Sequence, residues 1–395
     1  MADLINIIEK PLSGEWGSDD LEGDGIPVLR TTNFTNSGEV SYINVVTRTI
    51  AKKNIANKYL RKGDIIIEKS GGSDDKPVGR VVFFEGPENT YLFNNFTGLL
   101  RISDTSKWHP KFVFYFLFAN YIKGGTRPYE NKTTGLHNLK LDRYLASLRV
   151  HDLDLQTQMQ CSNTLDKITA IIQNHKTLLS KLDNLVKARF VEMFGDFVEN
   201  PRNWRVEELG DYIVFMTSGP RGWSKYFSDA GEYFLTIRNV KGCNVFTENI
   251  QHVRCPNNAE ADRTKVKEGD LLISITADLG RTGVVSEQIA NHGTYINQHL
   301  MCVRLMKEML HPVYVAHLLE SEGGRLQFSQ KNQSAVKAGL NYESIRTLKI
   351  MVPPMHLQLA FVAFITQVDK SKVAVQKALD KAQQLYDSLM QEYFD

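Results

Sequence analysis

The sequence predicts an α+β protein of two similar mixed α/β domains, separated by two long helices that pair as an antiparallel coiled coil with pseudo-two-fold symmetry. Two observations lead to this prediction. A set of short motifs occurs twice in the same order, as in a diverged duplication. Each copy is followed by a stretch with heptad periodicity and no internal proline or glycine.

The repeat is marked by a Gly-Asp pair before an apolar run, KGDIIIEKSGG at 62–72 and EGDLLISIT at 268–276. Glycine permits the turn, aspartate bonds back to it, and the Ile/Leu-rich run suits a buried strand. Asn33 in VLRTTNF precedes Asn239 in FLTIRNV by the same interval as Gly63 precedes Gly269. Further pairs follow in order: FNN (93–95) with YIN (295–297), which aligns Asn95 with Asn297; HPKFVFYFL (109–117) with HPVYVAHLL (311–319); and TTGLHNL (133–139) with KAGLNYE (337–343).

Heptad stretches follow both copies. The residues expected to pair the helices are Ile168, Leu179, Leu182 and Val186 in the first, and Ile365, Val368, Val375 and Leu379 in the second. The predicted layout is a domain at 1–150, a helix at 151–200, a domain at 201–352 and a helix at 353–395. Because the first helix enters the second domain and the second helix leaves it, the pair is antiparallel, with a spacer of about 45 Å. Asp166 to Asp183 spans more residues than Asp369 to Asp380, which predicts helices that differ in detail.

The composition is that of an ordinary folded protein, with 42% hydrophobic residues and a formal net charge of +2. This mildly basic balance permits a polyanionic partner without requiring one. The four cysteines form no CxxC pair and no metal-ligand spacing. No apolar run approaches a membrane span, and the N-terminus does not have the pattern of a signal peptide. We therefore expect a cytoplasmic protein with no membrane contact and no metal site.

Catalytic motifs are sparse. The sequence has no GxxxxGK[ST] loop and no HExxH pair. Asp64, Glu68 and Lys69 resemble the acid–acid–lysine set of metal-dependent nucleases, but Glu68 and Lys69 are adjacent, and adjacent strand residues point to opposite faces. The second copy carries Ser274 and Ile275 at these positions. A nuclease remains an alternative hypothesis, and a coiled-coil scaffold that binds proteins is another.

Polar, glycine-bearing segments with basic residues recur in both copies: KSGGSDDKPVGR and GGTRPYENKTTGLHNLK (124–140) in the first, TADLGR and QKNQSAVKAGLN (330–341) in the second. Such side chains contact phosphates and base edges, although ordinary solvated loops share this composition. The candidate DNA-binding residues are Lys69, Arg80, Arg127, Lys132 and His137 in the first domain, and Arg221, Arg238, Arg281, Lys331, Asn332, Gln333 and Lys337 in the second.

The order IPVLRTTNF, KGDIIIEKSGG, PVGRVVFF, FNN, TTGLHNL and a long helix, repeated as FLTIRNV, EGDLLISI, GRTGVV, YIN, KAGLN and another long helix, resembles the DNA-specificity (S) subunits of type I restriction–modification systems. The resemblance covers essentially the whole chain. The Glu-Gln pair that follows the family's Pro-Pro turn is echoed here by His356-Leu357-Gln358 and, in the first copy, by Leu155-Gln156.

The resemblance implies two target-recognition domains, each reading half of a split site in double-stranded DNA, with the helices fixing the gap. It also implies a subunit without catalysis or cofactors of its own. Two modification subunits would methylate adenine with S-adenosylmethionine, and restriction subunits would use ATP and Mg²⁺.

Overall fold

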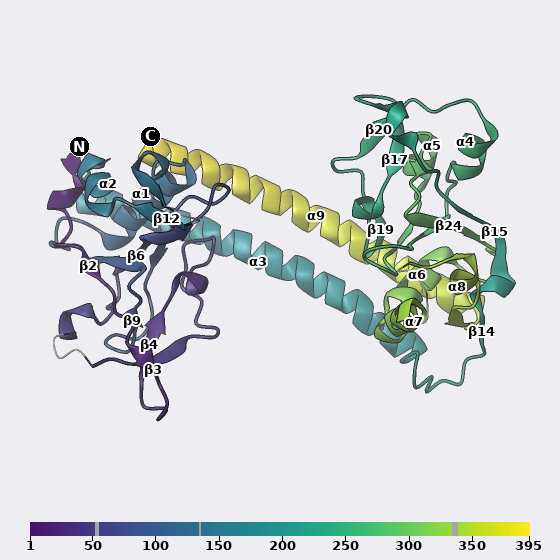
Figure 1. Cartoon of the computed structure of the whole chain (residues 1–395), viewed down its shortest axis with the longest axis horizontal. Helices are drawn as coiled ribbons and strands as arrows, with labels where there is room; N and C mark the ends of the chain where they lie inside the picture. Colours follow the sequence, from purple (N-terminus) through teal and green to yellow (C-terminus); the bar gives the residue numbers. More distant parts are fainter. Residues whose placement is uncertain (52–54, 134–135, 334–338) are drawn as a thin grey trace. The chain divides into compact units, whose positions relative to one another are not determined.

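A computed structural model describes residues 1–51, 55–133, 136–333 and 339–395 (Figure 1). The chain divides into two compact units. Unit 1 comprises Met1–Lys176 and Lys377–Asp395, and unit 2 comprises Thr177–Gln376. Unit 1 is thus built from two stretches distant in sequence, whereas the predicted domains follow one another along the chain.

Two four-stranded sheets form the framework of unit 1. The order in the first sheet is β2 (Leu12–Ser13), β10 (Thr97–Leu100), β6 (Ile65–Glu68) and β8 (Val81–Phe83). The order in the second is β3 (Ser18–Asp19), β5 (Val46–Thr49), β4 (Ile26–Leu29) and β9 (Leu92–Phe93), with β4 and β9 parallel. A short pair joins β1 (Ala2–Asp3) to β13 (Arg149–Val150), and the helices of this domain are α1 (Pro110–Ile122) and α2 (Leu141–Ser147).

The central strand β6 is buried on both faces. Ile65 and Ile67 join the core beneath α1, while Ile66 faces the opposite way into the core shared with the second sheet. A strand covered on both sides reads as a continuous apolar run without polar alternation. This position explains the run IIIE after the first Gly-Asp pair, and the buried strand predicted there is confirmed.

Unit 2 repeats this framework. Its first sheet has the order β15 (Ile213–Ser218), β24 (Leu300–Leu305), β21 (Leu271–Ser274), β22 (Thr282–Val284), β19 (Cys243–Val245) and β18 (Val240–Lys241). Its second has the order β16 (Phe227–Ser228), β20 (Gln251–Val253), β17 (Glu232–Leu235) and β23 (Tyr295–Ile296), and β14 (Val206–Glu208) pairs with β25 (Lys349–Met351). The central strand β21 divides its side chains between two cores as β6 does, so the predicted duplication is confirmed.

The copies also carry different additions. Unit 1 adds a three-stranded sheet of β11 (Glu130–Thr133), β12 (Leu136–Leu139) and β7 (Ser70–Gly72). Unit 2 has the helices α4 (Ala259–Thr264), α5 (Glu287–Asn291), α6 (Pro312–Glu320), α7 (Glu322–Gln333) and α8 (Tyr342–Arg346). Of these, α6 stands where α1 stands in unit 1, and α8 where α2 stands.

Each Gly-Asp motif makes the turn that the sequence predicts. Gly63 and Gly269 have φ of 92° and 78°, a region that favours glycine. The Asp64 carboxylate accepts a hydrogen bond from the Arg61 amide at 2.8 Å, and its two oxygens take the Arg101 guanidinium at 2.8 and 2.7 Å.

Asp270 in unit 2 repeats this arrangement. Its carboxylate accepts from the Lys267 amide at 2.8 Å and from Arg304 at 2.7 Å through both oxygens. Both aspartates are almost completely buried, so a full set of bonds is needed to offset their desolvation.

Two 40-residue helices, α3 (Leu155–Phe194) and α9 (Met355–Phe394), contribute to both units. All eight predicted pairing residues are buried or half-buried. In unit 2, Phe190 of α3 contacts Phe361 of α9 with ring centroids 5.3 Å apart, and Asp183 pairs with Lys372 at 2.7 Å. Positions on one helix rise as those on the other fall, which is the antiparallel pairing that the sequence predicts.

The ends of the helices complete the two cores in the same way. Phe194, at the end of α3, packs on Tyr314 of α6 at 4.8 Å, and Phe394, at the end of α9, packs on Phe112 of α1 at 5.2 Å. In unit 1, Cys161 near the start of α3 shares a core with the end of α9.

The expected difference between the helices is wrong, because both have 40 residues. The Asp pairs that suggested it are not equivalent positions. Gln158 and Gln358 are the true counterparts: the first accepts from the His109 amide at 2.9 Å, the second from the His311 amide at 2.8 Å. Gln158 therefore takes the place assigned to Leu155-Gln156.

Two of the motif alignments also shift. The backbone amide of Asn94 donates to the Leu29 carbonyl in unit 1, and the backbone amide of Asn297 donates to the Leu235 carbonyl in unit 2. Asn94, and not Asn95, therefore matches Asn297. The amide of Leu139 donates to Lys69, and that of Leu340 donates to Ile275, both at 2.8 Å. Leu139 therefore matches Leu340, although the shared Gly-Leu letters align Leu136 there. Within the described residues, no helix is long and apolar enough to cross a membrane.

Substitution of His317 should weaken the pH dependence of unit 2 stability. This side chain lies beside Phe361, and burial lowers its pKa to about 4. Between pH 6.5 and pH 4 the unfolded chain therefore binds a proton that the folded chain does not, so stability is lost as pH falls. We expect His317→Leu to reduce the loss between about pH 7 and about pH 5 by about 2 kcal/mol in urea unfolding. An equally steep loss in the variant would contradict this.

Candidate nucleic-acid interface

The two polar segments of unit 1 come together in the three-stranded sheet. β7 belongs to the first segment, and β11 and β12 belong to the second. The carbonyl of Lys69 accepts the Leu139 amide at 2.8 Å, which ties the segments at the end of β6. Residues far apart in sequence thereby share one surface, as the contact between Ser70 and Asn138, 68 positions apart, illustrates.

Unit 2 joins its two segments at the equivalent point. The Leu340 amide donates to the carbonyl of Ile275 directly after β21. A Cβ on Gly280 would lie 2.4 Å from the Phe328 ring, so glycine allows the first segment to approach α7 closely. Both units therefore join the loop after the central strand to the segment before the last short helix, a contact that the sequence did not predict.

In each unit a third loop, which the sequence analysis missed, adjoins the two polar segments. The Lys69 amide donates to the Phe96 carbonyl at 2.8 Å, and the Ile275 amide donates to the His299 carbonyl at 3.0 Å. Phe96 is 48% exposed, and His299 Nδ1 lies 2.8 Å from the Thr276 hydroxyl. The signal was in the repeated FNN and YIN motifs, which end one residue before Phe96 and two residues before His299.

The side chains of Arg80 and His137 bond to other groups of the protein at this surface. Arg80 donates to the carbonyls of Thr31 at 2.8 Å and Phe34 at 3.1 Å, and its guanidinium lies 3.7 Å from Glu68. His137 is buried, with Nδ1 2.9 Å from Glu130.

The second Glu130 oxygen accepts the Val78 amide at 3.1 Å, which anchors the end of loop 73–78. In the same unit, Arg127 is exposed and donates to the Asp74 carbonyl at 3.2 Å. Lys132 lies in β11 opposite His137, and its side chain is outside the described part of the structure.

The unit 2 candidates are more scattered. Arg221 and Arg238 are exposed, while Arg281, which occupies the position of Arg80, pairs with Asp278. Lys331 donates to the Thr347 hydroxyl at 2.6 Å, and Asn332 accepts the Gly339 amide at 3.2 Å. Gln333 ends α7, with a side chain outside the described part, and Lys337 lies outside the described residues altogether.

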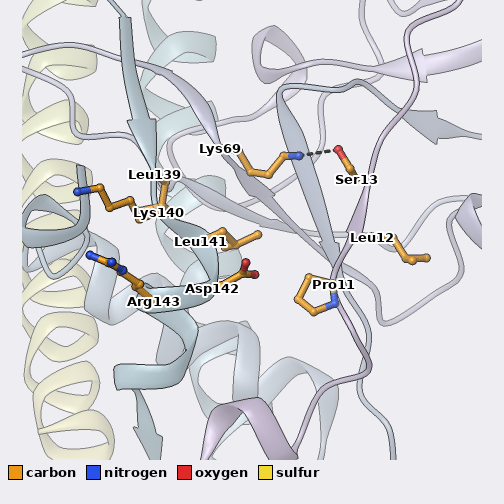
Figure 2. Close-up of a pocket in the computed structure, with 9 residues that line it drawn as sticks. All are labelled: Pro11, Leu12, Ser13, Lys69, Leu139, Lys140, Leu141, Asp142 and Arg143. Atoms are coloured by element: carbon orange, nitrogen blue, oxygen red, sulfur yellow. Dashed lines mark hydrogen bonds between the residues drawn. The ribbon is translucent and has the colours of Figure 1, made fainter. Parts of the chain in front are cut away.

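A hollow of about 530 Å³ opens beside Lys69, and we call it the Lys69 pocket (Figure 2). Lys69 Nζ donates to the Ser13 hydroxyl at 2.6 Å, and burial together with repulsion from Lys58 lowers the pKa of Lys69. Lys140 and Arg143 lie in this view on the side of Leu141 away from Ser13. The remaining lining residues are Pro11, Leu12, Leu139 and Asp142. Polar and charged side chains outnumber apolar ones in this lining, so the hollow suits a polar ligand surface.

The two acids of the nuclease hypothesis, Asp64 and Glu68, lie beside arginines in the structure. Asp64 is occupied by Arg101, and burial raises the pKa of Glu68, which faces Arg80. No group of three or more His, Cys, Asp or Glu side chains among the described residues has an arrangement that could hold a metal ion.

Comparisons with known proteins agree with the duplicated architecture. The family model described as "Type I restriction modification DNA specificity domain" matches residues 6–184 and 201–383. The type I restriction enzyme MjaX specificity subunit of Methanocaldococcus jannaschii is 21% identical over 98% of this chain and 91% of its own length.

Two solved structures share the fold at 14% identity and a TM-score of 0.58, each covering the whole of this chain. One comes from a study of complex assembly and conformational transition in the type I restriction–modification system and is covered to 96%. The other is the S subunit of such a system from M. genitalium, covered to 95%.

Removing the His137 imidazole should loosen loop 73–78. In His137→Leu, Glu130 loses one of its two bonds, so its hold on the Val78 amide weakens. We expect hydrogen exchange at Val78 to accelerate about tenfold, in line with the loss of a buried charge-assisted bond. Lys76→Ala, which truncates an exposed side chain of the same loop, serves as the matched control. Unchanged exchange in His137→Leu would show that the imidazole does not anchor the loop.

Proposed function

Because this chain belongs to the type I restriction–modification DNA specificity family, we propose that each of its two units reads one half of a split site in double-stranded DNA. The observation that carries the proposal is the duplication. The family model matches twice, and both copies bring the same polar segments together after the central strand. Two related reading surfaces in one chain suit a target made of two parts.

The chemistry of these surfaces suits DNA. Arginine and lysine on loops neutralise phosphates, which supplies affinity and makes it depend on salt. Asn, Gln, Ser and Thr near the same loops donate to or accept from base edges, which supplies discrimination. Arg127, Arg221 and Arg238 are exposed and suit the first role. Arg80 and His137 are better assigned to holding the loops in place, because their donors already have partners in the protein.

We assign to α3 and α9 the task of fixing the gap between the two half-sites. The support is their equal length and the burial of their seam residues in both units. A pair of helices resists bending far better than a flexible linker does. The helices would therefore fix the number of base pairs in the gap, whereas a flexible linker would only set its maximum.

The remaining chemistry of the system is assigned to partner subunits. Two modification subunits would bind S-adenosylmethionine and methylate adenine, and restriction subunits would use ATP and Mg²⁺. This chain would carry no catalysis and no cofactor. In support, its sequence has no nucleotide-binding loop, and the acids that resemble a nuclease set are paired with arginines.

The test is selection of bound fragments from a randomised duplex library by this chain co-expressed with its modification subunit. We expect a motif in two parts separated by a fixed run of unspecified bases. One continuous motif would contradict the two-part reader. Absence of any enrichment would favour the protein-binding scaffold, and Mg²⁺-dependent cleavage by the chain alone would favour the nuclease.

Lengthening both helices should lengthen the gap. Seven residues inserted after Lys176 in α3 and seven after Gln376 in α9 add two turns to each helix, which lengthens the pair by about 10 Å. The unspecified run should therefore grow by about 3 base pairs in the same selection, with both half-sites unchanged. Insertion in α3 alone takes its seam out of register and should abolish selective binding. An unchanged gap after the double insertion would refute the spacer role.

A further inference from the structure

The two units share one framework, and one spot on that framework carries different side chains in the two copies. We infer that this spot, the Lys69 pocket of unit 1 and its counterpart in unit 2, is where each unit discriminates the base sequence of its half-site. The inference rests on the proposed function. Two copies that read different sequences must differ in the side chains with which they read.

Equivalent positions are fixed by matching backbone bonds. Ser13 pairs with Gly98 across the sheet as Ser218 pairs with Met301, so Met301 stands at the position of Gly98. Lys69 and Ile275 each donate to the connection before the neighbouring strand and accept from the segment before the last short helix. Leu141 and Tyr342 each open that helix. The buried Asp–Arg pairs described above are the same in both copies.

Unit 1 builds a hollow at this spot. Gly98 has no side chain, and a Cβ there would lie 3.2 Å from Leu141 and 3.4 Å from the Lys69 stem, so both side chains pass over the glycine. The Lys69 ammonium then reaches Ser13 at the rim (Figure 2). An ammonium held at the edge of this hollow presents donors to purine N7 and O6 atoms.

Unit 2 builds an aromatic surface at the same spot. Tyr342 is 43% exposed, and its hydroxyl accepts the Ser218 amide at 2.9 Å. Arg263 donates to the Ser218 carbonyl at 3.0 Å and also to the Thr217 hydroxyl. The ring is thus exposed and fixed in orientation, and Ile275 replaces the ammonium. Such a ring suits the thymine methyl group or a base face.

A carboxylate is common to both spots, Asp142 in unit 1 and Glu343 in unit 2, and both lie in the first turn of their helix. Because the two copies share it, it does not account for a difference in reading. The differences are Lys69 against Ile275, Leu141 against Tyr342, and Gly98 against Met301. Unit 1 therefore reads with a cationic donor, and unit 2 with an exposed ring.

The experiment exchanges these residues and repeats the library selection with the complete modification complex. One variant carries Ile275→Lys and Tyr342→Leu in unit 2, and another carries Lys69→Ile in unit 1. Each should change the preferred bases of one half-site by about tenfold in enrichment at one or two positions. The half-site read by the other unit should stay as in wild type, so every molecule contains its own control.

Milder and unrelated changes complete the design. Lys69→Met keeps the stem and removes the charge, and Tyr342→Phe keeps the ring and removes the bond to Ser218, so a reading can be obtained even if the exchange disturbs folding. Arg149→Ala removes an exposed charge elsewhere in unit 1 and should leave both half-sites unchanged.

The outcomes separate the two levels of the argument. A changed half-site in each exchange, with the other half intact, supports the inference. An unchanged two-part motif in all the pocket variants overturns it while the proposed function stands. Uniform weakening on every sequence also overturns it, because it assigns these side chains to phosphates. Absence of a two-part motif in wild type removes the proposed function, and the inference with it.

Discussion

Burial of one strand on both faces is the constraint on which the rest of each unit depends. β6 and β21 present no face to water, so a helix must cover one side and a second sheet the other. The strand also starts inside the protein, beside a buried carboxylate. Such a charge is tolerated only with a partner and with bonds to its remaining lone pairs, which the arginine and the turn amide supply. Turn, strand, ion pair and covering layers form one cooperative arrangement, and the chain contains it twice.

Most of this architecture could be predicted from the sequence because it is periodic. Heptad spacing revealed the seam of α3 and α9, and the repeated Gly-Asp motif revealed the central strands. Alignment inside the repeats was less secure, because similar letters are not always equivalent positions. Gly-Leu recurs in both copies, but Leu139, and not Leu136, makes the bond that Leu340 makes. Gln158 was missed because its role is to bond a distant amide, which leaves no periodic signal.

The sequence indicated the candidate surface as regions, not as side chains. Both segments of each unit do meet, but a basic residue on a loop can face outward or brace the loop. Arg80 and His137 brace it, and composition cannot reveal this. Tyr342 and Phe96 were overlooked because aromatic residues usually indicate a core, and only the structure shows them exposed. The exposure of a single aromatic side chain does not follow from the periodicity of the fold, so the sequence pattern does not predict it.

The contribution of α9 to unit 1 has a consequence for synthesis on the ribosome. Phe112 and Phe116 of α1 pack on Phe394, which is translated only after all of unit 2. The first recognition domain therefore emerges with an apolar surface that its final helix has yet to cover, while unit 2 obtains both of its helix segments in one uninterrupted stretch. Unit 2 can complete its core during translation, whereas unit 1 must wait. Premature termination within α9 would accordingly damage the domain that was made first.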